Sequence, residues 1–447
     1  MIAEPEVRAG YEWLSQFVTP EDWSERRRKI QCHLLEVARP HDSPIGSEEF
    51  RSVSIADDRF GWYLHLAETY LDHPESYEVI QGARVIPVLA QLGAHLDLLE
   101  RIGGVHERCA EIAGPERGNP DAGLFEILTA LMYARNGWPK VELIPRSRTE
   151  KRPDIHVSDG TTEWNIECKR LIGWSGYSTR ERKKWLRMWQ PLASHLWEEK
   201  LALVFEICFH VELESLPDDF VTRELAGKLP LMVPPCTLIS NREWTVQVRR
   251  VDMDRIRAHL SKSFVKQPSD QLQELVIGRR VRQGGTTCVF YGQGGTLGPP
   301  TGTNRVMQSI EFAAGAIWDC DAPRSIEIKA RDIRSHLADA VEQLPENVPA
   351  AVHVGLETLD GWPVEQERFE RIMGTVGIFD ARGKKLHWIY CHLFQPYSPP
   401  EKAWEFDETV YFFQSGDCTG PPPLKEYSMI VPHEFGRDGV HWKPEIL

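Results

Sequence analysis

Residues 153–171 alternate apolar and polar side chains around an Asp159-Gly160 pair. Alternation is typical of β-strands, and Asp-Gly is a frequent two-residue hairpin turn, so the segment predicts a β-hairpin. A two-residue loop pairs Ser158 with Thr161 and fixes the register of the rest of the ladder. One face of such a hairpin has to be buried, so the chain is expected to build a sheet here.

The predicted register sorts the hairpin side chains onto two faces. The apolar face consists of Ile155, Val157, Trp164, Ile166 and Cys168. The polar face carries Asp154, Asn165, Glu167 and Lys169, with Asp154 opposite Asn165 and diagonal to Glu167. Diagonal neighbours lie roughly 7 Å apart, so the two carboxylates can converge on one cation between them. The polar face is therefore a candidate site.

Two acids and a lysine on one face suit the hydrolysis of phosphodiester bonds. Like-charged carboxylates repel unless a hard cation lies between them, and Mg²⁺ prefers oxygen ligands. Such a metal acidifies a bound water and neutralises charge that develops on a phosphate. Lys169, two residues beyond Glu167, could orient or deprotonate that water and contact the phosphate.

A helix is expected to precede the hairpin, over residues 119–139. Asn119 can cap it, Pro120 suits its first turn, and its surface is apolar around most of the girth. Glu126 falls on a narrow stripe shared with Ala122, Thr129 and Tyr133. A carboxylate there needs a cation or a hydrogen-bond partner, so Glu126 is either a further site residue or one half of an ion pair with an arginine.

Pro153-Asp154, then twelve residues, then Glu167-Cys168-Lys169, preceded by an acidic helix, resembles the PD-(D/E)XK nuclease superfamily. The resemblance covers about residues 119–211. It implies that Asp154 and Glu167 bind Mg²⁺, for which Mn²⁺ could substitute. It further implies that Lys169 serves catalysis and that Glu126 completes the metal site.

The fold implied by the resemblance is a restriction-endonuclease-like mixed sheet flanked by helices, within the α/β class. Four strands are expected, at Val141 to Ile144, Pro153 to Ser158, Thr162 to Leu171 and Leu201 to Val211, with Thr179 to Lys200 as the crossover helix. Residues 1–115 predict an all-α region, 116–215 the nuclease-like core, and 216–447 a mixed α+β region that could complete that core.

A second acid-x-Lys sequence, Glu327-Ile328-Lys329, is expected on a strand. A helix at Arg331 to Leu344 and a strand at Ala350 to Leu356 would follow it. Its upstream acids are too close for a normal hairpin, so we interpret this stretch as structural. It could extend the sheet or complete the nuclease core, and the alternative is that it holds the site itself.

The net charge of −14 is unusual for a nucleic-acid-binding protein, since phosphate contacts need local positive charge. Residues 145–190 nevertheless hold eleven Lys and Arg against six Asp and Glu. The residues predicted to bind nucleic acid are Arg152, Arg170, Arg180, Arg182, Lys183, Lys184 and Arg187. The alternative is that this cluster is simply a solvated helix face.

The resulting hypothesis is a metal-dependent DNA endonuclease of restriction, repair or anti-phage defence, acting as a homodimer or with a partner subunit. The alternatives are a catalytically inactive nucleic-acid-binding module and a regulatory or scaffold subunit. The first residues lack the order of a secretory signal, and no apolar run reaches membrane-spanning length, so we expect no membrane partner and a cytoplasmic location. The nine cysteines form no CxxC pair and are expected to be mostly free thiols.

Overall fold

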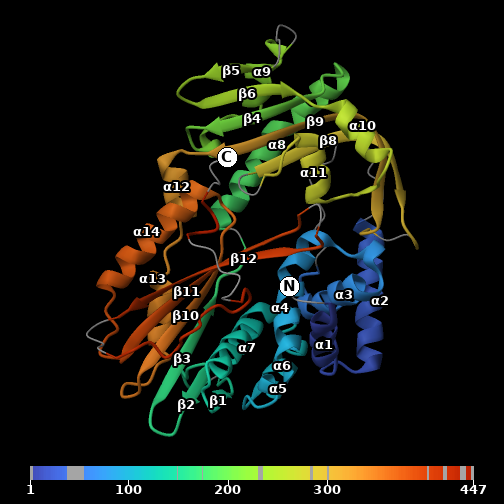
Figure 1. Ribbon diagram of the computed structural model, residues 1–447. Coiled ribbons are helices and arrows are strands. Elements are labelled where there is room, and N and C mark those ends of the chain that lie inside the picture. The colour runs from blue at the N-terminus through green and yellow to red at the C-terminus, as the bar shows by residue number, and fades with distance from the viewer. Residues whose placement is uncertain are drawn as a thin grey trace.

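The computed structural model describes residues 4–37, 55–147, 149–173, 175–229, 235–281, 285–299, 302–399, 402–415, 420–432 and 439–443. These residues form two mixed β-sheets with helices packed against both (Figure 1). The expected α/β class is confirmed. Strands β1, β2, β3, β10, β11 and β12 make the first sheet, and β4 to β9 make the second.

The first sheet contains the predicted hairpin and has the order β1-β2-β3-β10-β11-β12. Its strands are β1 Lys140–Leu143, β2 Ile155–Ser158, β3 Glu163–Arg170, β10 Ala350–Glu357, β11 Leu386–Tyr397 and β12 Glu405–Gln414. Neighbouring strands are antiparallel except at β3-β10 and β10-β11, which are parallel. Strand β3 therefore lies inside the sheet, with hydrogen-bonded neighbours on both edges.

Helices cover both faces of the first sheet. One face packs on α7 Pro120–Arg135 and the N-terminal helices, which share one continuous apolar core with β2 and β3. These N-terminal helices are α1 Glu4–Ser15, α2 Pro20–Val37, α3 Arg59–Asp72, α4 Val79–Ala94, α5 Leu96–Leu99 and α6 Val105–Ala113. The opposite face packs on α13 Arg334–Val341 and α14 Trp362–Ile378.

The second sheet is built from chain that leaves the first sheet after β3 and returns before β10. Its strands are β4 Leu203–Phe209, β5 Cys236–Ser240, β6 Trp244–Arg250, β7 Val265–Lys266, β8 Gly285–Thr296 and β9 Arg305–Cys320. Its helices are α8 Gly176–Glu198, α9 Phe220–Leu225, α10 Met253–Leu260 and α11 Asp270–Ile277. In Figure 1 it lies above the first sheet, and α8 and α12 (Pro323–Lys329) lie near the junction.

The prediction that residues 201–211 form the fourth strand of the nuclease-like sheet is wrong. Strand β4 pairs with β6 and β9 in the second sheet, and the place beside β3 is taken by β10, with Glu167 opposite Val352. Both β4 and β10 are strongly apolar strands, so their local sequences fit an interior position in either sheet. The expected helix and strand after residue 330 are thus present as α13 and β10, and they extend the first sheet.

The predicted hairpin register is also corrected. Ser158 pairs with Glu163 rather than with Thr161, because the loop has four residues instead of two. The carboxylate of Asp159 accepts hydrogen bonds from the backbone N–H groups of Thr161 and Thr162, which stabilises the wider loop. A shift of two residues leaves every side chain on its predicted face, and the predicted apolar face is buried in the core shared with α7.

Glu327 and Lys329 lie on helix α12, so the expectation of a strand there is wrong. Lys329 is buried and forms an ion pair with Glu181 of α8 at 2.7 Å. A buried lysine is stable as a cation only beside such an acid. The pair connects α12, which leads back to the first sheet, with α8, which follows β3. The second acid-x-Lys sequence is therefore a structural contact.

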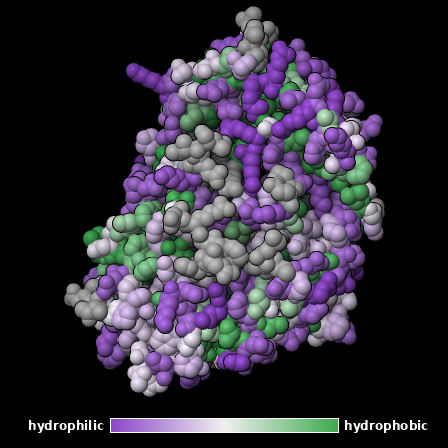
Figure 2. Space-filling view, viewed as in Figure 1, coloured by the Kyte–Doolittle hydropathy of each residue, from purple (hydrophilic) through white to green (hydrophobic). Residues whose placement is uncertain are grey.

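The face of the molecule seen in Figure 2 is mostly hydrophilic where the described residues form it, and apolar residues occur there in small separate groups. No helix among the described residues combines the length and apolar character needed to cross a bilayer.

Helices α1 and α4 pack backbone to backbone, which two glycines make possible. A Cβ atom at Gly93 would lie 1.8 Å from the carbonyl oxygen of Glu6, and one at Gly10 would lie 2.0 Å from that of Leu89. We predict that Gly93→Ala lowers the free energy of unfolding by about 1–3 kcal/mol, because the helices have to separate. Gly374→Ala on α14, where a Cβ meets nothing within 4 Å, is the control and should raise stability by up to about 1 kcal/mol. Equal effects of the two changes in chemical denaturation would contradict this packing.

Candidate functional site

Asp154 and Glu167 lie side by side on the polar face of the hairpin. The backbone N–H of Asp154, the residue before β2, donates to the carbonyl of Ile166 at 3.1 Å. The side-chain Oδ2 of Asp154 accepts from the backbone N–H of Cys168 at 2.8 Å. With the wider hairpin loop, the paired positions end at Ile155 opposite Ile166, and the Asp154 carboxylate lies close enough to Glu167 to raise the pKa of that acid.

The Glu167 carboxylate is buried, with the residue only 1% exposed. Its Oε1 accepts from Nζ of Lys169 at 2.7 Å and from Nε2 of Gln343 at 2.6 Å. Its Oε2 is buried and has no hydrogen-bond partner among the described residues. The Lys169 side chain is 20% exposed and so connects this pair with solvent.

Burial and the neighbouring Asp154 raise the pKa of Glu167 to about 9. Burial also raises the pKa of Asp154, although the Cys168 amide and the cations Arg108 and Lys169 oppose that shift. Two adjacent acids in a poorly solvated place cannot both ionise at low cost. A cation between them would remove the repulsion and allow both to be charged.

Glu126 lies on α7, is 4% exposed, and forms ion pairs with Arg108 and, at 2.7 Å, with Arg146. The arginine partner that the sequence left open is therefore present. Among the described residues, Glu126 does not join Asp154 and Glu167 in a closely spaced group of three ligands. Arg108 and Arg146 also favour the charged form of Asp154, so the same two arginines interact with Glu126 and with Asp154. The role of Glu126 as a metal ligand stays a prediction.

Three partners of the site were not foreseen from the sequence. Gln343 follows α13 and reaches Glu167 from a segment 176 residues further along the chain. Arg108 comes from α6 and Arg146 from the loop after β1, where arginines carry no pattern that marks them as site residues. Only packing of α6 and α13 around the hairpin brings these side chains to the two acids.

Most of the residues predicted to bind nucleic acid are engaged by nearby acids. Arg152 pairs with Glu150, Arg180 with Glu214, and both Lys184 and Arg187 with Asp218. Lys183 is exposed, and the half-buried Arg182 lies 6.0 Å over the ring of Trp318. Glu214 and Asp218, which lie outside residues 145–190, thus neutralise part of the positive excess seen in the sequence.

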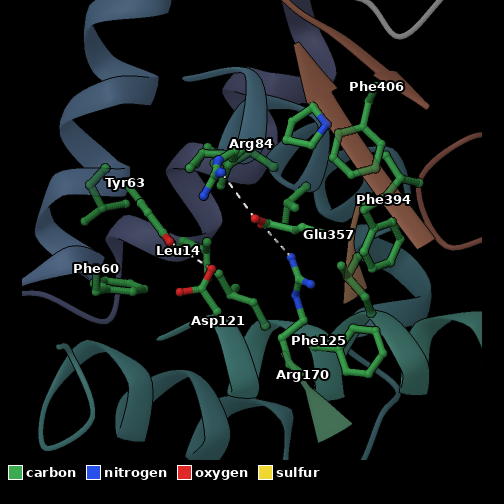
Figure 3. Close-up of a pocket in the computed structure, with 18 residues that line it drawn as sticks. Leu14, Phe60, Tyr63, Arg84, Asp121, Phe125, Arg170, Glu357, Phe394 and Phe406 are labelled. Atoms are coloured by element: carbon green, nitrogen blue, oxygen red, sulfur yellow. Dashed lines mark hydrogen bonds and ion pairs between the residues drawn. The ribbon is translucent and has the colours of Figure 1, made fainter. Parts of the chain in front are cut away.

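Arg170 lies at the end of β3 beside a cavity of about 60 Å³ between the first sheet and the N-terminal helices. Figure 3 shows Glu357 between Arg84 and Arg170, with contacts of 3.2 and 3.0 Å. Burial opposes ionisation of Glu357, but the two arginines outweigh it and lower its pKa. With a side chain only 12% exposed, Arg170 is placed as part of this buried ion-pair network.

Comparison with protein-family models, with curated proteins and with solved structures finds no match. Function is therefore inferred from the site itself. Paired carboxylate oxygens, one of them buried and without a partner, are donors that suit a hard divalent cation such as Mg²⁺. The residues present fit the metal that the resemblance implies.

We predict that Glu167→Gln stabilises the protein in metal-free buffer, increasingly as the pH rises. A raised pKa means that folding binds a proton between about pH 4.5 and about pH 9, so wild-type stability falls across this interval. Glutamine stays neutral, so its advantage should grow by up to about 1.4 kcal/mol per pH unit. Denaturant unfolding at several pH values measures it, with Glu163→Gln on the same strand as the exposed control. An advantage that shrinks with rising pH would contradict the buried, repelled acid.

We predict that Arg170→Ala lowers the free energy of unfolding by about 2–4 kcal/mol, because it leaves the buried Glu357 with one cation fewer. Arg152→Ala removes only an exposed pair and should stay within about 0.5 kcal/mol of wild type. The salt dependence of DNA binding should be the same in Arg170→Ala as in wild type. A weaker salt dependence of DNA binding in Arg170→Ala, without loss of stability, would instead support the prediction that Arg170 contacts nucleic acid.

Proposed function

We propose that the chain is a metal-dependent nuclease that hydrolyses phosphodiester bonds, with DNA as substrate, in restriction, repair or anti-phage defence. The observation that carries the proposal is the meeting of Asp154, Glu167 and Lys169 on the polar face of the hairpin, with the Glu167 Oε2 buried and unpartnered among the described residues. An apolar pair would stabilise this position better than two repelling acids, so the acids point to a function.

The element order supports a restriction-endonuclease-like fold. The resemblance implies an acidic helix, three strands, a crossover helix and a fourth strand. The chain has α7, the antiparallel β1-β2-β3, then α13 and the parallel β10 in that order, with the second sheet inserted after β3. Helix α13 and strand β10 thus take the places that residues 179–211 were expected to fill.

In the proposed mechanism, oxygens of Asp154 and Glu167 would hold Mg²⁺, for which Mn²⁺ could substitute. The metal, when bound, supplies an acidified water and neutralises charge on the phosphate. The Cys168 amide orients the Asp154 carboxylate beside that of Glu167, so both carboxylates would face a metal bound between them. Gln343 and Lys169 fix the other carboxylate through Oε1, which leaves Oε2 for the metal.

Lys169 has two tasks in this proposal. Its ammonium lies 2.7 Å from Oε1 of Glu167 and favours the charged form of that acid, which a metal ion needs. Since the side chain is partly exposed, the ammonium can then turn to the phosphate or to the attacking water. The exposed side of Lys169 and the half-buried Asp154 are accordingly the direction from which substrate would approach.

Three observations favour a second candidate, an inactive nuclease-like module with a regulatory or scaffold role. Glu167 is almost fully buried and is bonded by Gln343, while several cations expected to bind phosphate are in ion pairs with acids. A substrate would have to displace some of these contacts. The acidic net charge of −14 also suits a protein partner better than a lone DNA contact.

We predict Mg²⁺-dependent nicking or cleavage of plasmid DNA that falls at least about 100-fold in Asp154→Ala and in Lys169→Ala. The first change removes a metal ligand and the second the only cation bonded to Glu167 among the described residues. Glu163→Gln, on the outer end of the same strand, is the matched control and should keep full activity. Far-UV circular dichroism checks that each variant is folded.

The two candidates give different results in the same experiment. Undiminished cleavage by both folded variants would defeat the catalytic assignment. Mg²⁺ binding in calorimetry that depends on Asp154, without cleavage of duplex or single-stranded DNA or RNA by wild type, would favour the inactive module.

A further inference from the structure

A second group of potential metal ligands lies in the second sheet, apart from the proposed nuclease site. Cys208 and His210 stand at the end of β4 and just beyond it, and Asp321 follows β9. Strands β4 and β9 run parallel, with Cys208 opposite Asp319 and Phe209 opposite Cys320. The parallel register therefore carries residues more than a hundred positions apart to the same sheet end.

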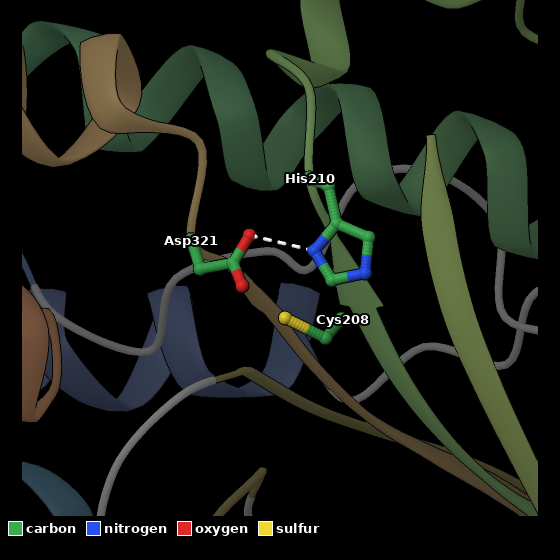
Figure 4. A group of neighbouring side chains, drawn as sticks. All are labelled: Cys208, His210 and Asp321. Atoms are coloured by element: carbon green, nitrogen blue, oxygen red, sulfur yellow. Dashed lines mark hydrogen bonds and ion pairs between the residues drawn. The ribbon is translucent and has the colours of Figure 1, made fainter. Parts of the chain in front are cut away.

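The ligand atoms of Cys208, His210 and Asp321 lie within 4.8 Å of one another, and this is the one such trio among the described residues. Figure 4 shows the thiol, the imidazole and the carboxylate converging on a common space. Four-coordinate zinc has bonds of roughly 2.0–2.3 Å, which separates its ligands by roughly 3.5 Å. Small side-chain rotations would bring the three atoms to that spacing.

The imidazole of His210 is held on both sides. Its Nε2 lies 2.8 Å from Oγ1 of Thr245, and its Nδ1 lies 2.8 Å from Oδ1 of Asp321. When Nε2–H donates to Thr245, the Nδ1 lone pair faces the carboxylate, and a proton or a metal ion has to lie between them. An outer hydrogen bond that fixes the ring in this way is typical of metal-binding histidines.

From this geometry we propose that Cys208, His210 and Asp321 form a zinc site in the second sheet. Thiolate and imidazole ligands select a borderline transition metal over Mg²⁺, so the site differs in chemistry from the Asp154–Glu167 pair. Three protein ligands leave the fourth position to water, as in zinc sites that are open to solvent. A bound ion would join the end of β4 to the chain that leaves β9 and leads back to the first sheet.

A cysteine-histidine-aspartate catalytic triad is the competing use of these residues. In a triad, the ring nitrogen that does not face the acid takes the proton of the nucleophile. Here that nitrogen is Nε2, which is bonded to Thr245. Cys208 therefore lies on the side of the His210 ring that faces Asp321. A metal ion shared by the three side chains fits this arrangement better than a catalytic triad does.

The test is metal binding by the full-length chain after removal of bound metal with a chelator. We expect one Zn²⁺ per chain in this site, and a thiolate-to-metal charge-transfer band when Co²⁺ replaces it. Cys208→Ser should remove the band and weaken Zn²⁺ binding at least tenfold. Cys236→Ser, a half-buried cysteine on β5 of the same sheet, is the matched control and should change neither.

A band that persists in Cys208→Ser, or a wild-type chain that binds no Zn²⁺, would overturn the proposal. His210→Gln and Asp321→Asn give an independent reading if Cys208→Ser does not fold, since each should weaken Zn²⁺ binding at least tenfold. Unchanged affinity in both would also overturn it. The double variant Asp154→Ala, Glu167→Gln should keep the band, so failure of the nuclease proposal would leave this result intact.

Discussion

The pairing of strand β3 on both of its edges is the constraint on which the rest of the structure depends. β2 pairs with it in antiparallel fashion and β10 in parallel fashion, while α7 and α13 cover its two faces. A strand held on four sides cannot slip or tilt, so Glu167 and Lys169 keep fixed positions relative to Asp154. The same enclosure takes the Glu167 carboxylate out of water and raises its pKa.

The pair of Asp154 and Glu167 therefore lowers the stability of the fold. The buried Glu167 lies beside the half-buried Asp154 with a single lysine, while Arg108 and Arg146 approach from the α7 side, where they also bond Glu126. Such local conflicts between fold stability and residue choice are expected at functional sites. The ion pairs around Glu357 and Lys329 differ, because each of those buried charges lies beside a charge of opposite sign.

A complete second sheet is inserted between β3 and β10, and it separates the two metal sites that we propose. Carboxylate oxygens on the first sheet suit a hard ion, whereas the thiol and imidazole on the second sheet suit zinc. The two sites are assembled differently: the antiparallel β2-β3 hairpin brings Asp154 to Glu167, whereas the parallel pair β4-β9 brings Cys208 to Asp321. The chain that leaves β9 continues through α12 to α13, so a bound zinc ion would sit at the start of the segment that carries Gln343 to Glu167.

The sequence by itself determined the hairpin, the two faces of its side chains, the preceding helix and the grouping of Asp154, Glu167 and Lys169, because alternation and capping act over a few residues. It did not determine the four-residue loop. The Asp159 carboxylate accepts hydrogen bonds from two backbone N–H groups of that loop, and these bonds favour it over a two-residue turn. The choice of β10 over β4 beside β3, the arginines on Glu126 and the meeting of Cys208 with Asp321 were decided only by the tertiary structure. Each of these contacts joins residues far apart in the chain, and strand pairing and packing over such separations leave no local pattern.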